Sequence, residues 1–236
     1  MQKTFDLAAK ILIILVIPFW ILIGSVRMLV TSEYLRIEYN KVDFPEDPFG
    51  FSKEQRISFA SENVRYLREN LPISALENQK NEDQALYNLR ELSHMEDVQD
   101  VYQFFWTFWT VITAIIGLVA ILSLIWRRNW QAFASALRIG GFGTAIFIAL
   151  IGLLAFIGWD TWFLIFHKLF FSDGTWTFNF SDTLIRLFPQ KFWVDAVFTV
   201  SGLSLIFGLL TGFLGRRLAK WTSIATQSLI IKQNSL

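Results

Sequence analysis

Four apolar stretches dominate this sequence, and each is long enough to cross a lipid bilayer as a helix. A helix needs about twenty apolar residues to cross the hydrocarbon layer. The chain is 53% hydrophobic and has a positive mean hydropathy, well above the apolar content of ordinary soluble domains. We therefore predict an all-α membrane protein that forms a single membrane domain over residues 1–236, with four transmembrane helices at about 7–30, 101–126, 139–165 and 195–215.

The positions of Lys and Arg predict how these helices are oriented, because cytoplasmic segments carry an excess of both residues. Basic residues precede the first apolar stretch, separate the second from the third, and follow the fourth: Lys3 and Lys10; Arg127, Arg128 and Arg138; Arg216, Arg217 and Lys220. We expect both termini in the cytoplasm. An insert at 31–100 and a loop at 166–194 then lie on the outer face.

Composition and motifs exclude several classes of function. Residues 31–103 hold fifteen acidic against eight basic residues, and no sustained basic face is present, so nucleic acid is not an expected partner. The chain has no cysteine, which excludes disulfides, thiolate metal sites and Cys nucleophiles. No GxSxG, HExxH or P-loop motif occurs, and no metal-ligand spacing is recognisable, so we expect no metal or other cofactor.

The later apolar stretches also argue against transport. Away from their ends they carry no charged residue, whereas ion and proton pathways usually need buried charges. Their glycines instead indicate close helix packing: Gly140, Gly141, Gly143, Gly208 and Gly212.

Local signals predict an α-rich cap on the outer face that includes a few short strands. Ser52 and Gln55 have capping-box spacing, and the helix that they open should stop at Pro72. Ser93 and Glu96 have the same spacing, so the second long helix should begin there. The tripeptide Ser172-Asp173-Gly174 reads as a turn, residues 175–180 alternate like a strand, and Asp182 should open a short helix that ends before Pro189.

The chain has two histidines, His94 and His167, and the predicted topology places both at the outer membrane surface. Histidine is the side chain that changes charge near neutral pH, so the pair is a candidate acid and base. Asp160 lies seven residues before His167, and Asp97 three after His94, so each could orient an imidazole. The alternatives are ordinary interfacial side chains and, for Asp97, a helix cap or a surface charge.

Two stretches carry a family resemblance: ELSHMEDV, and WDTWFLIFHKLFF followed by GTW, DTLIRLFP and Asp195. Together they resemble the bacterial lipoprotein intramolecular transacylase family, Lit, a group of four-helix integral membrane proteins. The resemblance implies a cofactor-free acyltransferase in the bacterial plasma membrane whose substrate is a diacylated lipoprotein among membrane lipids. It implies that the sn-2 acyl chain moves from glycerol to the cysteine α-amino group, and that His94 and His167 are the essential histidines.

Three further residues, Trp176, Asp182 and Arg186, are candidates for shaping the site or contacting substrate, with packing and helix capping as the alternative. The sequence leaves open which histidine is the base, whether an acyl-imidazole forms, and which group stabilises the oxyanion. Two other functions are also compatible with these residues. One is a hydrolase or acyltransferase acting on phospholipid acyl esters, and the other is a non-catalytic membrane interaction protein.

Overall fold

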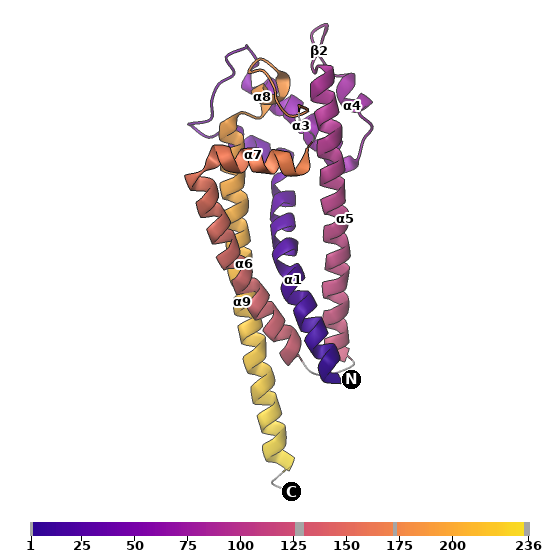
Figure 1. Cartoon of the computed structure of the whole chain (residues 1–236), viewed down its shortest axis with the longest axis vertical. Coiled ribbons are helices and arrows are strands. Elements are labelled where there is room, and N and C mark those ends of the chain that lie inside the picture. The colour runs from indigo at the N-terminus through magenta and orange to yellow at the C-terminus, as the bar shows by residue number, and fades with distance from the viewer. Residues whose placement is uncertain (1, 126–129, 172–173, 234–236) are drawn as a thin grey trace. The chain divides into compact units, whose positions relative to one another are not determined.

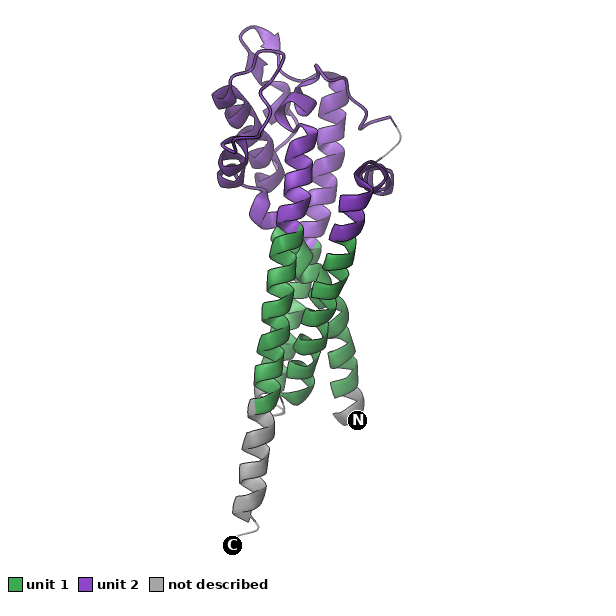
Figure 2. Cartoon of the chain, turned by 90° about the vertical axis from the view of Figure 1, so that its left-hand side faces the viewer, with its two compact units in different colours: residues 1–25, 108–151, 201–236 green, residues 26–107, 152–200 purple. Residues whose placement is uncertain are grey.

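The computed structural model describes residues 2–125, 130–171 and 174–233 (Figure 1). Arg127, Arg128 and the first two residues of the predicted turn at Ser172 lie outside the described residues. The chain forms two compact units, coloured separately in Figure 2. Unit 1 comprises residues 1–25, 108–151 and 201–236, and unit 2 comprises residues 26–107 and 152–200.

Four long helices run through the predicted apolar stretches: α1 (Gln2–Leu29), α5 (Leu89–Ile125), α6 (Gln131–Ile157) and α9 (Gln190–Gln233). Each contains a segment that is long and apolar enough to cross a membrane, at Asp6–Leu29, Leu89–Ser123, Gln131–Ile157 and Gln190–Lys220. The predicted fold class is therefore confirmed. The helices α5 and α9 begin before residues 101 and 195, so each continues beyond the stretch that hydropathy marked.

The core of unit 1 forms where α1 meets α6. Ile13, Ile17 and Ile21 follow one another at intervals of four residues, so they share one face of α1, and all three are buried. They pack against Phe133, Ala136 and Leu137 of α6. Two tryptophans of this unit also have partners for their polar edges, because Trp20 Nε1 donates to Thr113 Oγ1 and Trp109 Nε1 donates to the Trp20 carbonyl, at 2.8 and 2.9 Å.

Glycines let α6 and α9 approach each other closely inside unit 1. A Cβ atom added at Gly141 would lie 2.4 Å from the backbone nitrogen of Gly212 and 2.7 Å from the carbonyl oxygen of Gly208. The predicted role of these three glycines is thus confirmed. Gly143 differs, because a Cβ there would meet nothing within 4 Å.

Unit 2 contains the cap elements, which are short helices and one small hairpin. They are α2 (Ser32–Tyr39), α3 (Lys53–Glu69), α4 (Ser74–Glu77), β1 (Lys80–Asn81), β2 (Gln84–Ala85), α7 (Trp159–Phe170) and α8 (Thr183–Leu187). The strands pair antiparallel, with Lys80 opposite Ala85. The helix predicted from Ser52 is confirmed with its full capping box, and α8 begins after Asp182 as expected. The strand predicted at residues 175–180 is wrong, because that segment has no strand partner.

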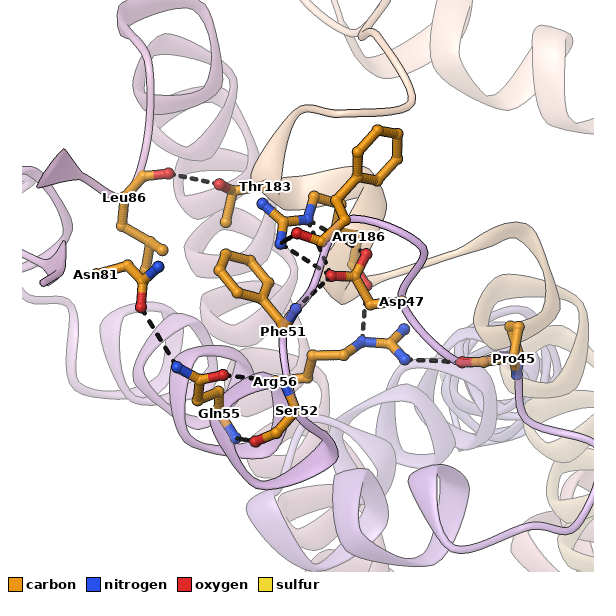
Figure 3. Close-up of polar contacts among 11 residues, drawn as sticks. Pro45, Asp47, Phe51, Ser52, Gln55, Arg56, Asn81, Leu86, Thr183 and Arg186 are labelled. Atoms are coloured by element: carbon orange, nitrogen blue, oxygen red, sulfur yellow. Dashed lines mark hydrogen bonds and ion pairs between the residues drawn. The ribbon is translucent and has the colours of Figure 1, made fainter.

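The core of unit 2 joins segments that lie far apart in the sequence. Buried side chains from α3, α4, α5, α8 and the segments just before α3 and α5 form one cluster: Phe51, Tyr66, Leu76, Leu86, Tyr87, Leu92, Met95, Leu184 and Leu187. Buried polar contacts add to it, since Arg56 donates to the carbonyl oxygens of Arg186 and Pro45 at 2.9 and 2.7 Å (Figure 3). The insert is therefore held by apolar packing together with satisfied polar groups.

Candidate active site

A break at Gly158 positions the helix that carries His167. The third apolar stretch was predicted as one helix over 139–165, but α6 ends at Ile157 and α7 begins at Trp159. Gly158 adopts a non-helical conformation, with φ −133° and ψ 54°, and α7 runs crosswise to the unit 2 part of α5 (Figure 1). His167 therefore lies on a separate short helix.

The aromatic residues of α7 form a continuous surface that leads to His167. Trp159, Trp162 and Phe166 stack in succession, with ring centroids 5.6 and 5.7 Å apart. Phe163 lies one helical turn before His167, and their ring centroids are 3.9 Å apart. The imidazole is therefore held among aromatic rings rather than in bulk water.

The other histidine, His94, lies near the start of α5, and this helix begins earlier than predicted. Asn88 caps this helix, because its Oδ1 accepts hydrogen bonds from the backbone nitrogens of Arg90 and Glu91 at 3.0 and 3.1 Å. Glu91 completes the box by accepting from the backbone nitrogen of Asn88 at 2.9 Å. The predicted start at Ser93 is thus wrong, and His94 lies in the second helical turn instead of the first.

The two histidines converge on one phenylalanine. The ring centroid of Phe171 lies 4.9 Å from that of His94 and 5.6 Å from that of His167. Phe178 packs on His94 at 5.3 Å, and Trp176 packs on His167 at 4.9 Å. Both imidazoles and the three aromatic residues belong to unit 2, so this cluster is formed within one compact unit. We refer to these five residues as the histidine cluster.

The protonation of His167 follows from its surroundings. Its Nδ1 atom lies 2.8 Å from the carbonyl oxygen of Phe163, which can only accept a hydrogen bond. The neutral ring must therefore carry its proton on Nδ1, which leaves a lone pair on Nε2. Burial lowers the pKa of His167, and the hydrogen bond to Phe163 only partly offsets that effect. His167 is consequently neutral at pH 7 and able to accept a proton.

Two buried polar atoms in the histidine cluster lack partners among the residues that the structure describes. They are Nδ1 of His94 and Nε1 of Trp176. Buried polar atoms in folded proteins are nearly always hydrogen-bonded, so such atoms need an explanation. Their position beside a pair of titratable groups makes them candidates for contact with a substrate.

The two aspartates that were expected to orient the histidines do not do so. Asp160 is exposed, and the Nδ1 atom of His167 is engaged by the Phe163 carbonyl instead. Asp97 is half-buried, and among the described residues the Nδ1 atom of His94 accepts or donates no hydrogen bond. The backbone carbonyl of a neighbouring turn therefore takes the role that was predicted for a carboxylate at His167.

Asp182 and Arg186 lie in the cap and hold its segments together. Asp182 accepts hydrogen bonds from Arg90 and from the backbone nitrogen of Asn179, both at 2.8 Å. Arg186 donates to the fully buried Asp47 at 2.8 Å, and its guanidinium lies 3.3 Å from the ring centroid of Phe51 (Figure 3). For both residues these contacts support a structural role, although the Asp182 side chain makes no capping hydrogen bond to α8.

Asp195, the last residue of the resemblance, also has structural partners. It accepts from Lys41 and Lys191 at 2.9 and 2.8 Å. Lys41 in turn lies 2.8 Å from the fully buried carboxylate of Glu38. Burial raises the pKa of Glu38. These contacts join α2 to the first turns of α9.

Sequence reasoning missed Phe171 and Phe178, which contact the histidines directly. Phe171 lies four residues after His167, a spacing that places the two side chains next to each other at the end of a helix. That spacing was a usable signal. Phe178 lies in a segment without regular structure, and nothing in its spacing pointed to His94.

Apolar helices of membrane-crossing length and a half-buried pair of histidines define a multi-pass membrane enzyme. The family model described as lipoprotein intramolecular transacylase Lit matches residues 11–193, which is most of the chain. The chain belongs to the Lit family and is therefore an acyltransferase. A relative from Aquifex aeolicus (strain VF5), described as an uncharacterized protein, is 30% identical over 221 residues, covering 89% of this chain and 96% of the relative.

Solved structures agree with the fold. The membrane integral lipoprotein intramolecular transacylase Lit from Bacillus cereus is 21% identical, with a TM-score of 0.80 over 94% of this chain and 100% of that chain. A histidine-to-arginine mutant of the same protein has a TM-score of 0.74 at 21% identity, over 95% of this chain and 96% of that one. At this level of identity the likeness concerns the fold.

Proposed function

We propose that this enzyme moves the sn-2 acyl chain of a diacylglyceryl-cysteine lipoprotein to the α-amino group of the same cysteine, giving the N-acyl lyso form. The observation that carries the proposal is the convergence of His94 and His167 on Phe171. They are the two histidines of the whole sequence. Membership of the Lit family supports the reaction class.

The proposed reaction needs acid and base chemistry but no oxidant, reductant or second substrate. The amine nitrogen attacks the ester carbonyl carbon and forms the amide bond. The bond from that carbon to the glycerol sn-2 oxygen breaks. One proton leaves the nitrogen and one proton reaches the departing oxygen, so the atoms balance within a single substrate. Histidine, whose unperturbed pKa lies near neutrality, is a side chain that suits these proton transfers.

His167 is the base in this proposal. Its neutral ring carries the Nδ1 proton toward the Phe163 carbonyl, so Nε2 is free to take the proton of the attacking amine. The lowered pKa keeps that lone pair available at pH 7. The carbonyl of Phe163 also stabilises the imidazolium that forms, because a protonated ring donates more strongly through Nδ1.

His94 gives a proton to the leaving glycerol oxygen, and the proton that His167 has taken from the amine replaces it, so both imidazoles end as they began. It approaches Phe171 from α5 while His167 approaches it from α7, so the two imidazoles can serve different atoms of one bound ester. Its unpartnered Nδ1 is not held by another residue of the described chain. The surrounding Phe171 and Phe178 rings limit the access of water, which would otherwise hydrolyse the ester.

The distribution of basic residues supports a location for this site at the outer face of the bacterial plasma membrane, with both termini in the cytoplasm. Lys10 lies near the start of the first candidate span, Arg138 near the start of the third, and Arg216 near the end of the fourth. The cap elements and the histidine cluster lie in the other segments of the chain. Lipoprotein substrates anchored by acyl chains would meet the site at the interface.

The test is mass spectrometry of the N-terminal lipopeptide of a reporter lipoprotein, from cells that lack other N-acylating enzymes. Wild type should convert the diacyl form to the N-acyl lyso form. His94→Gln and His167→Gln should each slow the conversion by about 10²–10⁴-fold, the usual contribution of acid–base catalysis. Lys168→Gln is the matched control, because Lys168 is exposed on α7 next to His167.

Purified enzyme then distinguishes the substrates. The diacyl lipopeptide and a phospholipid are supplied together in detergent, and the loss of acyl chains from each is followed. Acyl loss from phospholipid alone would replace the proposal with a phospholipid hydrolase or acyltransferase. Full conversion of lipopeptide by the double variant His94→Gln/His167→Gln would remove the proposed role of the histidines.

A further inference from the structure

The indole nitrogen of Trp176 is the most unusual polar atom in the histidine cluster. Trp176 Nε1 is buried and has no hydrogen-bond acceptor among the described residues. An indole N–H can only donate, so no rearrangement of its own proton can satisfy it. A buried donor without an acceptor destabilises the folded state, because it loses its hydrogen bond to water. The described part of the chain thus holds this donor in place and offers it no acceptor.

The segment that carries Trp176 contacts both histidines. Trp176 packs on His167 with ring centroids 4.9 Å apart, and Phe178, two residues later, packs on His94 at 5.3 Å. The donor therefore lies beside the imidazole that acts as base in the proposed reaction. An ester that reaches Nε2 of His167 would bring its carbonyl group close to the edge of the Trp176 ring.

Acyl transfer needs a donor at this place. When the amine attacks the carbonyl carbon, an electron pair moves to the carbonyl oxygen, and a positioned donor stabilises the negative charge that develops there. Phe163, Phe171 and Phe178 contact the histidines but carry no donor. The Nδ1 proton of His167 is already engaged by a backbone carbonyl. The proposed reaction assigns His94 to the leaving oxygen, so among the described residues of the histidine cluster Trp176 is the remaining side chain with a proton to give.

We propose that the indole N–H of Trp176 donates a hydrogen bond to the carbonyl oxygen of the ester that is transferred, and stabilises the oxyanion of the tetrahedral intermediate. This inference rests on the proposed function. Trp176 remains a donor throughout, so no proton is transferred from it. The bond strengthens as charge develops, and the effect falls on kcat more than on KM.

The first test is Trp176→Phe, which keeps an aromatic ring and removes the N–H. The conversion of a diacyl lipopeptide by purified enzyme should fall in kcat by about 10²–10³-fold, as for the loss of one oxyanion donor, with KM changed only a few-fold. The matched control is Trp193→Phe. Trp193 is largely exposed, and its ring contacts are with Phe188 and Phe192, so kcat should be retained.

A second variant separates the donor from the packing of the ring. Replacing Trp176 with benzothienylalanine by codon suppression keeps the two fused rings and exchanges the N–H for sulfur. We expect the same loss of kcat as for Trp176→Phe, with an unchanged Tm. Wild-type kcat in the benzothienylalanine enzyme would overturn the proposal and leave Trp176 as a packing residue.

The two proposals fail in different ways. Lipopeptide conversion by wild type together with full activity of the benzothienylalanine enzyme overturns the role of Trp176 alone. An absence of lipopeptide conversion by well-folded wild type overturns the proposed function, and the role of Trp176 falls with it.

Discussion

Replacing Gly141 with alanine should weaken the contact between α6 and α9. The added Cβ would lie 2.4 Å from the Gly212 backbone nitrogen and 2.7 Å from the Gly208 carbonyl oxygen. Both neighbours are backbone atoms and cannot rotate away, so the helices must separate by about 1 Å to restore ordinary contact, and this forfeits much of their dispersion energy. Overpacking of this kind costs about 1–3 kcal/mol.

The intrinsic preference of helices for alanine over glycine returns about 0.5–1 kcal/mol, so the net destabilisation should be about 1–2 kcal/mol. Gly143→Ala is the matched control, since its Cβ would meet nothing within 4 Å on the same helix. It should be neutral or stabilise by up to about 1 kcal/mol.

The assay is unfolding of purified protein in mixed micelles, followed by far-UV circular dichroism at increasing fractions of denaturing detergent. The prediction concerns the difference between the two variants, which removes effects that alanine has at any helical position. Equal midpoints for Gly141→Ala and Gly143→Ala would show that the close approach of α6 and α9 does not contribute to stability.

Two further predictions concern single groups in unit 2. Burial lowers the pKa of His167, so its imidazole should titrate below the ordinary value of 6.5, and the folded state should lose stability as the pH falls below that value, because the unfolded chain takes up the proton first. NMR of protein with isotopically labelled histidine measures the pKa of His167, because His94→Gln leaves the signal of His167 for assignment. A titration midpoint at or above 6.5 would contradict the role of burial. In the wild-type protein, burial raises the pKa of the Asp47 carboxyl, but the hydrogen bonds from Arg186 and the Phe51 N–H outweigh burial and lower that pKa. Arg186→Ala removes the cation and leaves the carboxylate of Asp47 buried without it. We expect a loss of about 3–5 kcal/mol, visible as faster proteolysis of the cap, with lipopeptide conversion retained at low temperature; a folded but inactive variant would return Arg186 to the active site.

The start of α5 shows how tertiary structure chose between two local signals. Asn88 with Glu91 and Ser93 with Glu96 have the same capping-box spacing, so local rules favour both. In the structure Glu91 is buried and also accepts from the backbone nitrogen of Leu184 at 2.7 Å. This contact with α8 stabilises the earlier start, and it could not be read from the residues around position 90.

The segment at 175–180 shows the same limit for strands. Its alternating pattern satisfies the period of a strand, but a strand also needs a neighbour with which to share hydrogen bonds. The structure gives it none, and uses Trp176 and Phe178 to contact the two histidines instead. The alternating pattern therefore does not show which residues these side chains pack against.

The sequence by itself determined the apolar helices and the capped helix at Ser52, and it predicts that both histidines lie at the outer membrane surface. Each of these follows from interactions within about twenty neighbouring residues, namely hydropathy, capping and charge. Only the tertiary structure decided that His94 and His167 meet on Phe171, that Arg186 pairs with an aspartate 139 residues away, and that the Nδ1 atom of His167 faces a carbonyl oxygen. These contacts join segments distant in sequence or depend on side-chain orientation, so no local pattern encodes them.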